Sequence, residues 1–176
     1  EQQFRTAREN CPASRREEVW EGVLVVPPQA NNEHQTIVMD LCYAIASVID
    51  REAGDVVLPG ANVSDRDAGW IENYRDPDVV VYLATNPALN SDTHWVGGPD
   101  LAVEVISRGE KPHAKFDFYA KVGTREVLIV DRDPWVLELY QLQGVALVLV
   151  GTSALASGAV LPGCAPPPTL PLQPGT

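Results

Sequence analysis

Residues 100–106 read Asp-Leu-Ala-Val-Glu-Val-Ile (DLAVEVI), a largely aliphatic run that holds Glu104 in its middle. Aliphatic side chains occupy both alternating sets of positions, which is typical of a strand that is covered on both faces of a sheet. Residues 78–83 (DVVVYL) show the same pattern. We therefore predict two central strands, separated by a polar loop that is rich in Asn, Gly and Pro.

The segments around these two strands predict two helices and several more strands. One helix is expected from Asn31 or Asn32 to about Ala53, because apolar residues recur there at helical spacing. A second helix is expected from Pro112 to about Val122, closed by Gly123. Further strands are expected at residues 18–26, 56–58, 61–63, 126–130, 136–142 and 145–150, the last two as a hairpin. This order predicts a mixed α/β or α+β sheet with helices packed on it.

The composition is that of one globular domain. The chain has 176 residues, of which 45% are hydrophobic and 21% charged. We expect a polar N-terminal segment at residues 1–17, a folded domain at 18–164 and a Pro-rich tail at 165–176. No apolar run approaches the roughly 20 residues of a membrane span, and the first 17 residues hold no apolar block. The sequence therefore predicts a cytoplasmic protein without a membrane partner.

The charge distribution is uneven. The net charge of −11 argues against a protein that coats nucleic acid with a broadly basic surface. However, five Lys and Arg residues against two acids give residues 108–125 a net charge of +3, and the remainder sums to −14. This local cationic strip suits an anionic ligand held at one place, although an ordinary solvated helix is the simpler alternative.

Two acids and one lysine are the candidates for chemistry. Glu104 and Asp78 belong to apolar strand segments, where a carboxylate is rarely tolerated unless it is paired, hydrogen-bonded or bound to a metal. The alternatives are a solvent-facing edge position for Glu104 and a turn cap for Asp78. Lys115 shares the sheet-facing side of its helix with Phe118 and Tyr119. Its alternative is a snorkelling side chain with its ammonium in water.

Several motifs carry a resemblance to a known family. They are residues 77–81 (PDVVV), 98–107 (GPDLAVEVIS), 115–123 (KFDFYAKVG), 126–131 (EVLIVD), 22–28 (GVLVVPP) before Glu33-His34-Gln35, and 161–163 (LPG). In order and spacing they resemble the Uma2 family, restriction-endonuclease-like proteins of the PD-(D/E)xK nuclease superfamily. The resemblance covers about residues 19–163.

The resemblance implies a fold, a reaction and a site. The fold would be a restriction-endonuclease-like mixed sheet flanked by helices, and the reaction would be Mg²⁺-dependent (or Mn²⁺-dependent) hydrolysis of DNA phosphodiester bonds by an endonuclease. By this resemblance, Asp78, Glu104 and the Val105 carbonyl would ligate the metal. The lysine that the superfamily usually carries two residues after the glutamate is replaced by Ile106, so Lys115 from the following helix would act as the catalytic lysine.

Three secondary residues complete the candidate site. Lys111 is the reserve lysine, one turn before Lys115. Glu33 and His34 are candidates for supporting roles, and a helix-capping Glu with an ordinary first-turn His is the alternative.

Other functions remain open at the level of the sequence. A nuclease-fold binding or regulatory protein without catalytic activity is one alternative, because the segment between Ser107 and Lys115 is shorter than is usual in the family. Hydrolysis of a small phosphoester is another, which the net charge favours. Double-strand cleavage by an enzyme with one site needs two copies, so we expect a homodimer.

Overall fold

The computed structural model describes residues 17–107, 109–155 and 161. Its helices are α2 (Asn32–Ala46) and α3 (Phe116–Val122), with short 3-10 turns η1 (Trp70–Glu72) and η2 (Pro112–Lys115). Its strands are β1 (Glu18–Trp20), β2 (Val23–Val25), β3 (Val56–Pro59), β4 (Val63–Ser64), β5 (Tyr74–Arg75), β6 (Val79–Tyr82), β7 (Leu89–Asn90), β8 (Trp95–Val96), β9 (Leu101–Val105), β10 (Glu126–Arg132), β11 (Trp135–Gln143) and β12 (Ala146–Ala154).

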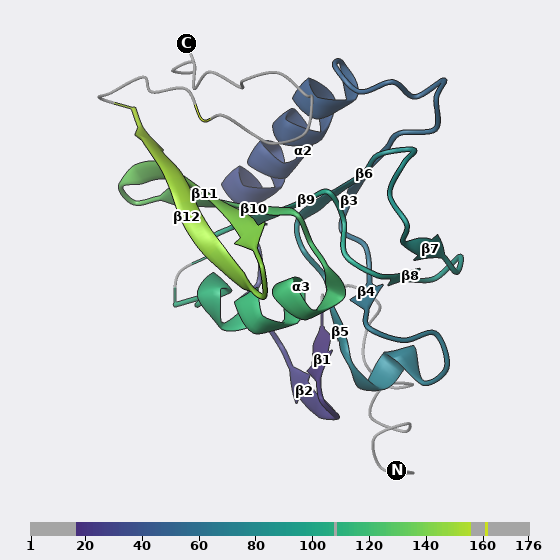
Figure 1. The fold of residues 1–176 in the computed structure, drawn as a ribbon. Helices are drawn as coiled ribbons and strands as arrows, with labels where there is room; N and C mark the ends of the chain where they lie inside the picture. Colours follow the sequence, from purple (N-terminus) through teal and green to yellow (C-terminus); the bar gives the residue numbers. More distant parts are fainter. Residues whose placement is uncertain (1–16, 108, 156–160, 162–176) are drawn as a thin grey trace.

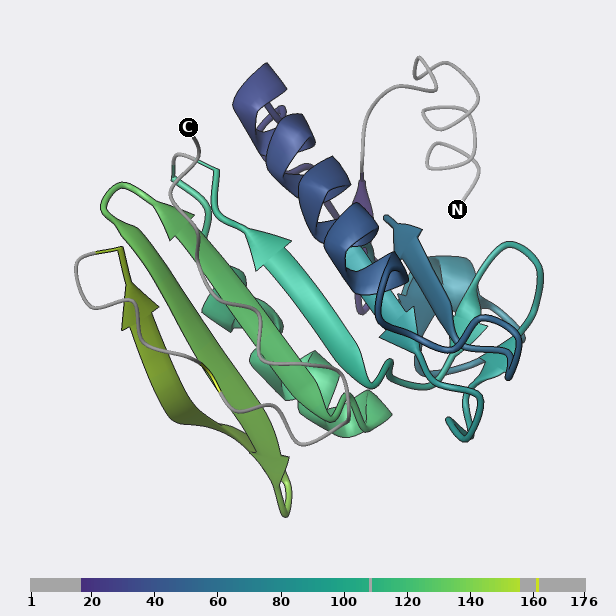
Figure 2. The same cartoon turned by 90° about the horizontal axis from the view of Figure 1, so that it is seen from above.

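A large mixed sheet forms the centre of the molecule. Its strand order is β12-β11-β10-β9-β6-β3, and only β9 and β10 run parallel. Figures 1 and 2 show α2 and α3 on opposite faces of this sheet. Both strands predicted to be central, β6 and β9, have a neighbour on each side. The sequence prediction of a mixed sheet flanked by helices is therefore confirmed.

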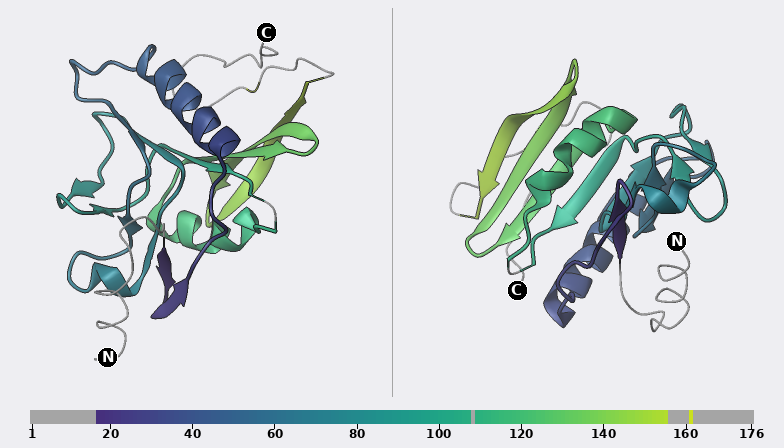
Figure 3. Two further views of the ribbon diagram at one scale, coloured as in Figure 1. Left: turned by 180° about the vertical axis from the view of Figure 1, so that it is seen from behind. Right: turned by 90° about the horizontal axis from the view of Figure 1, so that it is seen from below.

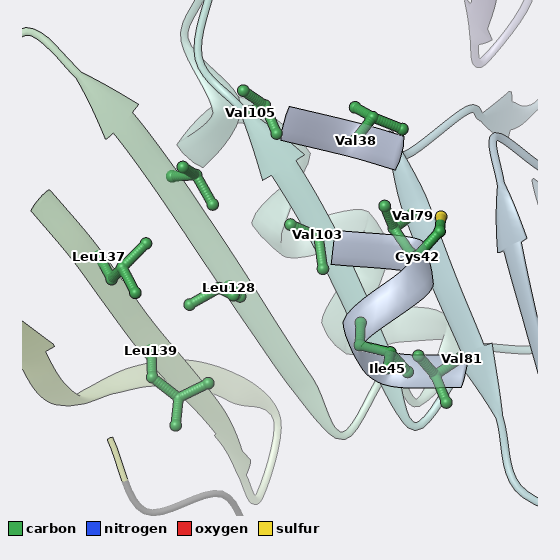
Figure 4. Close-up of a cluster of buried hydrophobic side chains, with 11 residues drawn as sticks. Val38, Cys42, Ile45, Val79, Val81, Val103, Val105, Leu128, Leu137 and Leu139 are labelled. Carbon is green, nitrogen blue, oxygen red and sulfur yellow. The ribbon is translucent and has the colours of Figure 1, made fainter. Parts of the chain in front are cut away.

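One hydrophobic core lies between the large sheet and α2. Val38, Cys42 and Ile45 of α2 face the alternate positions of β6 and β9 (Figure 4). The strand residues in this core are Val79, Val81, Val103, Val105, Leu128, Val130, Leu137 and Leu139. The side chain of Asn31 caps α2 by accepting a hydrogen bond from the His34 amide at 2.9 Å.

A second core lies between the sheet and α3. It contains the side chains of the other strand parity, Val80, Tyr82, Ala102, Val127 and Ile129, together with Phe118 and Tyr119 of α3. Because successive side chains of a strand alternate between faces, Glu104 points to the same face as Ala102, toward α3. The position of Glu104 in β9 thus directs its carboxylate under the second helix.

A small sheet stands beside the large one, with the order β2-β1-β5-β4-β8-β7. Figure 3 shows its β1–β2 hairpin beside α3, and Lys121 of α3 contacts Glu21 of the hairpin turn at 3.4 Å. These strands have only two or three residues each, and β5, β7 and β8 were not predicted.

Two predicted elements need correction. The strand expected at residues 18–26 is a hairpin, because Glu21 (φ 47°) and Gly22 (φ 83°) turn the chain between β1 and β2. The helix expected to reach Ala53 ends at Ala46. After it, the Asp50 side chain accepts hydrogen bonds from the amides of Glu52 and Ala53, which builds a separate turn.

The second predicted helix begins as a 3-10 turn, η2, before α3 continues it to Gly123 in the left-handed conformation. Apart from Glu17, the expected N-terminal segment lies outside the described residues, as does the Pro-rich tail. No helix in residues 17–107 or 109–155 is long and apolar enough to cross a membrane.

Candidate active site

A pocket of about 590 Å³ opens where the two sheets meet the first turn of α2 and the 3-10 turn η2. Its walls come from β1, the β2–α2 loop, the first turn of α2, the β5–β6 connection, β9, the β9–η2 loop and η2. The polar residues that line it are Glu18, Gln29, His34, Gln35, Asp76, Asp78, Glu104, Ser107, Glu110 and Lys115. Glu104, Asp78 and Lys115, the three candidates from the sequence, therefore line one cavity.

Glu104 is held by two side chains of the η2–α3 segment. The residue is 2% exposed, and its carboxylate receives hydrogen bonds from Lys115 Nζ at 2.9 Å (Oε1) and 2.8 Å (Oε2). The hydroxyl of Tyr119, one helical turn further on, donates to Oε1 as well. The alternative of a solvent-facing edge position is excluded, since β9 lies inside the sheet.

Lys115 contacts two carboxylates from different sheets. Its Nζ lies 2.9 Å from Glu18 Oε1 of β1, in addition to the contacts with Glu104 of β9. Glu110 is further away, at 4.0 Å. With 5% of its surface exposed, Lys115 is not the snorkelling side chain of the alternative interpretation.

Asp78 lies directly before β6 and is tied to β9 and α2. Its Oδ2 accepts a hydrogen bond from the Val105 amide at 2.8 Å and lies 3.1 Å from His34 Nε2. Both Asp78 and His34 are buried. Asp78 is therefore more than a turn cap, because its carboxylate connects the first turn of α2 with the residue that follows Glu104.

The other two secondary candidates lie apart from the pocket lining. Glu33 is exposed and forms an ion pair at 3.0 Å with Arg132. Arg132 also donates two hydrogen bonds to the Ile106 carbonyl, so Glu33 helps to join α2 to the end of β9. Lys111 is exposed at the start of η2. Among the reserve residues, only His34 faces the pocket.

The surroundings of the pocket raise the pKa values of three buried side chains, Glu104, Lys115 and Tyr119. Burial raises the pKa of Glu104, and the Lys115 charge offsets only part of this effect. Burial would lower the pKa of Lys115, but the carboxylates of Glu104 and Glu18 outweigh it and raise that pKa. Burial, and next to it Glu104, also raises the pKa of Tyr119. Lys115 and Tyr119 therefore stay protonated as donors at neutral pH.

Comparison with known proteins places this arrangement in a family. Residues 2–173 match the profile of Uma2, which is described as "Putative restriction endonuclease". The chain belongs to the Uma2 family. The resemblance inferred from the motifs is thus confirmed. A search of curated proteins found no significant match to this Uma2 chain.

A solved structure shares the fold of the Uma2 chain. It is the crystal structure of a protein from Anabaena variabilis described as "a putative nuclease belonging to DUF820". The two are 18% identical with a TM-score of 0.64, and the match covers 83% of this chain and 80% of the other. The likeness supports the restriction-endonuclease-like fold.

The donor chemistry of the Uma2 pocket fits a hard divalent cation bound by few protein ligands. Asp78 and Glu104 offer carboxylate oxygens, and Mg²⁺ is commonly held by one or two carboxylates together with water and phosphate oxygens. Within the part of the chain that the structure describes, no three His, Cys, Asp or Glu side chains are grouped to hold a metal. The Val105 carbonyl remains a predicted third donor.

Sequence reasoning missed two residues of the Uma2 pocket. The sequence places Tyr119 on the sheet-facing side of its helix, and its spacing of four residues from Lys115 is a usable signal for a shared contact. Glu18 had no such signal. Glu17 and Glu18 are adjacent acids at the start of a strand, and only the fold shows that Glu18 is buried.

Proposed function

We propose that this Uma2 chain is a Mg²⁺-dependent (or Mn²⁺-dependent) endonuclease that hydrolyses DNA phosphodiester bonds. The observation that carries the proposal is the direct contact of Lys115 with both oxygens of Glu104, in a pocket that also includes Asp78. Two acids and a lysine in a buried pocket are the groups that metal-assisted phosphodiester hydrolysis needs. The family match supports the same assignment.

The side chains of the pocket divide the work. Asp78 and Glu104 would hold the metal ion, which when bound would lower the pKa of its water and neutralise phosphate charge. Lys115 would place its positive charge next to the phosphate and stabilise the charge that develops there. Tyr119 fixes one oxygen of Glu104, and His34 with the Val105 amide fixes one oxygen of Asp78.

One observation favours a second function, a nuclease-fold binding or regulatory protein that does not cut. Both oxygens of Glu104 are occupied by Lys115. Among the described residues, the pocket lining holds five acids, Glu18, Asp76, Asp78, Glu104 and Glu110, and one lysine, Lys115. Such a pocket repels phosphate unless a cation enters with it. Calorimetric titration with Mg²⁺ and Mn²⁺ separates the two functions, because only the nuclease requires metal binding that D78N or E104Q abolishes.

Cleavage assays test the nuclease directly. Purified chain is incubated with supercoiled plasmid, single-stranded DNA, RNA and a nucleotide phosphodiester, each with Mg²⁺, Mn²⁺ or EDTA. We expect DNA cleavage that needs the metal, is lost in D78N and E104Q, and falls about 10²–10³-fold in K115M. Matched controls are D117N and E52Q, which make the same chemical changes at exposed positions. Unchanged cleavage by both D78N and E104Q would refute the assignment.

We also propose that the active form is a homodimer, since a one-site enzyme needs two copies to cut both strands of a duplex. Sedimentation equilibrium of the full chain, with and without a DNA duplex, measures this. A chain that makes double-strand breaks as a monomer in both conditions contradicts the proposal.

A further inference from the structure

Glu18 is a buried acid of the pocket to which the proposed reaction gives no role. It is the first residue of β1, in the small sheet, and 2% of its surface is exposed. Its Oε2 accepts a hydrogen bond from the Trp20 indole at 2.7 Å. Its Oε1 accepts one from the Asp76 amide at 3.0 Å and lies 2.9 Å from Lys115 Nζ.

The β-structure around Glu18 does not require a negative charge. Backbone pairing holds β1 to β2 on one side and to β5 on the other, through Val19 and Tyr74. A buried carboxylate loses its hydration, and an apolar side chain of similar size at the same strand position would avoid that cost. The nearby guanidinium of Arg75 donates to Asn73 and to backbone carbonyls. The cation that Glu18 contacts directly is Lys115.

The two acids of Lys115 differ in what else they must bind. Glu104 is the acid that the proposed function assigns to the metal ion, and a metal at its oxygens would compete with the ammonium. The other bonds of Glu18 come from an indole N–H and a backbone amide, which are neutral donors. The contact between Glu18 and Lys115 is therefore compatible with a cation on Glu104.

We propose that Glu18 is a positioning residue that holds the Lys115 ammonium in the pocket and so leaves Glu104 available to a divalent cation. The proposal rests on the proposed function in its second half. Its first half concerns only the contact between β1 and η2, so the two can be tested apart.

Lysine labelling tests the first half without metal and without activity. The chain has three lysines, so an amine-acetylating ester and mass spectrometry give the labelling rate of Lys115 with Lys111 and Lys121 as internal references. The variant E104Q keeps Glu18 as the remaining strong acid on Lys115. We expect its Lys115 to stay within about threefold of the wild-type rate, and E104Q/E18Q to label about tenfold faster or more, the effect of one charged hydrogen bond.

The outcomes of the labelling decide the positioning role. Equal labelling of Lys115 in E104Q and in E104Q/E18Q, at matched circular dichroism, overturns it. If the double variant does not fold, E104Q/E18D takes its place, because aspartate keeps the charge but withdraws it by one methylene, and faster labelling is again expected. E104Q combined with E52Q controls for a second Glu→Gln change at an exposed position.

Steady-state cleavage tests the second half. We expect E18Q to lower kcat about tenfold or more at unchanged KM, E18D to recover part of the loss, and E52Q to match the wild type. Metal-dependent cleavage by the wild type with an equal kcat in E18Q overturns the role of Glu18 alone. Absence of cleavage by the wild type instead overturns the proposed function, and the labelling result on Lys115 remains valid.

Discussion

Replacing Lys115 by Met is the most informative test of how the pocket is held together. The methionine keeps the apolar stem and removes the ammonium, which contacts Glu104 at 2.8 and 2.9 Å and Glu18 at 2.9 Å. Both glutamates are about 2% exposed, so solvent compensates little for the lost cation. K115M therefore leaves two buried acids without their common partner.

The expected cost is large. Removing one partner of a buried ion pair costs about 3–5 kcal/mol, because the remaining charge is stranded. The total free energy of unfolding of a single domain is about 5–15 kcal/mol. For a chain of this size, such a loss lowers the melting temperature by about 6–20 °C.

The pH dependence of K115M has a definite sign. Burial already raises the pKa of Glu104 in the wild type, and Lys115 acts to lower it. Without Lys115 the pKa of Glu104 rises further above its unfolded value. The native variant then takes up this proton at a higher pH than the native wild type does, so the stability deficit of K115M shrinks as the pH falls toward about 8, the pKa of Glu104 in the wild type, and stays constant below it.

Thermal and urea unfolding measure both effects. The control is K121M, which removes an exposed ammonium from Asp65 and leaves that acid paired with Arg66, so it costs about 1 kcal/mol or less. The triple variant K115M/E18Q/E104Q removes the stranded charges and should recover at least half of the loss. A destabilisation of K115M no greater than that of K121M, or a deficit that grows as the pH falls, would refute the reasoning.

Two further predictions concern residues that position the strands of the site. In G98A the new Cβ would lie 2.2 Å from Thr124 N and 2.6 Å from Thr124 Oγ1, so we expect the free energy of unfolding in urea to fall by about 3 kcal/mol or more. The control is G144A in the open hairpin turn, for which we expect a loss of about 1 kcal/mol. Equal losses in the two variants contradict the steric argument. In H34A the buried Asp78 loses its imidazole partner, and we expect the free energy of unfolding to fall by about 1–3 kcal/mol. A fall below about 0.5 kcal/mol, which is typical of neutral surface substitutions, shows that this contact does not stabilise the fold.

The central strands could be predicted because their side chains repeat a simple pattern. Residues 78–83 and 100–106 are apolar on both faces, and the structure covers them with a helix on each side. The small sheet could not be predicted in full, because strands of two or three residues are shorter than any period that a sequence displays. The early end of α2 was hidden, since Val48 and Ile49 continue its apolar spacing.

The candidate site was predicted in part, for a related reason. Glu104 and Asp78 were conspicuous because acids are rare in apolar strands, and Lys115 because it shares a helix face with aromatic residues. The contact of Glu18 with Lys115 joins two distant segments and depends on how the small sheet docks. Local sequence patterns carry no information about such docking, so the contact of Glu18 with Lys115 can be seen only in the three-dimensional structure.

The bridge that Lys115 makes between Glu18 and Glu104 also bears on how the protein is made. A ribosome delivers β1 early and η2 much later, and segments emerge from the N-terminal side first. A chain whose synthesis is half complete therefore contains Glu18 but not yet Lys115, the lysine that pairs with it. The pocket is complete only once η2 has been synthesised and has docked, so a nascent chain that lacks η2 is inactive.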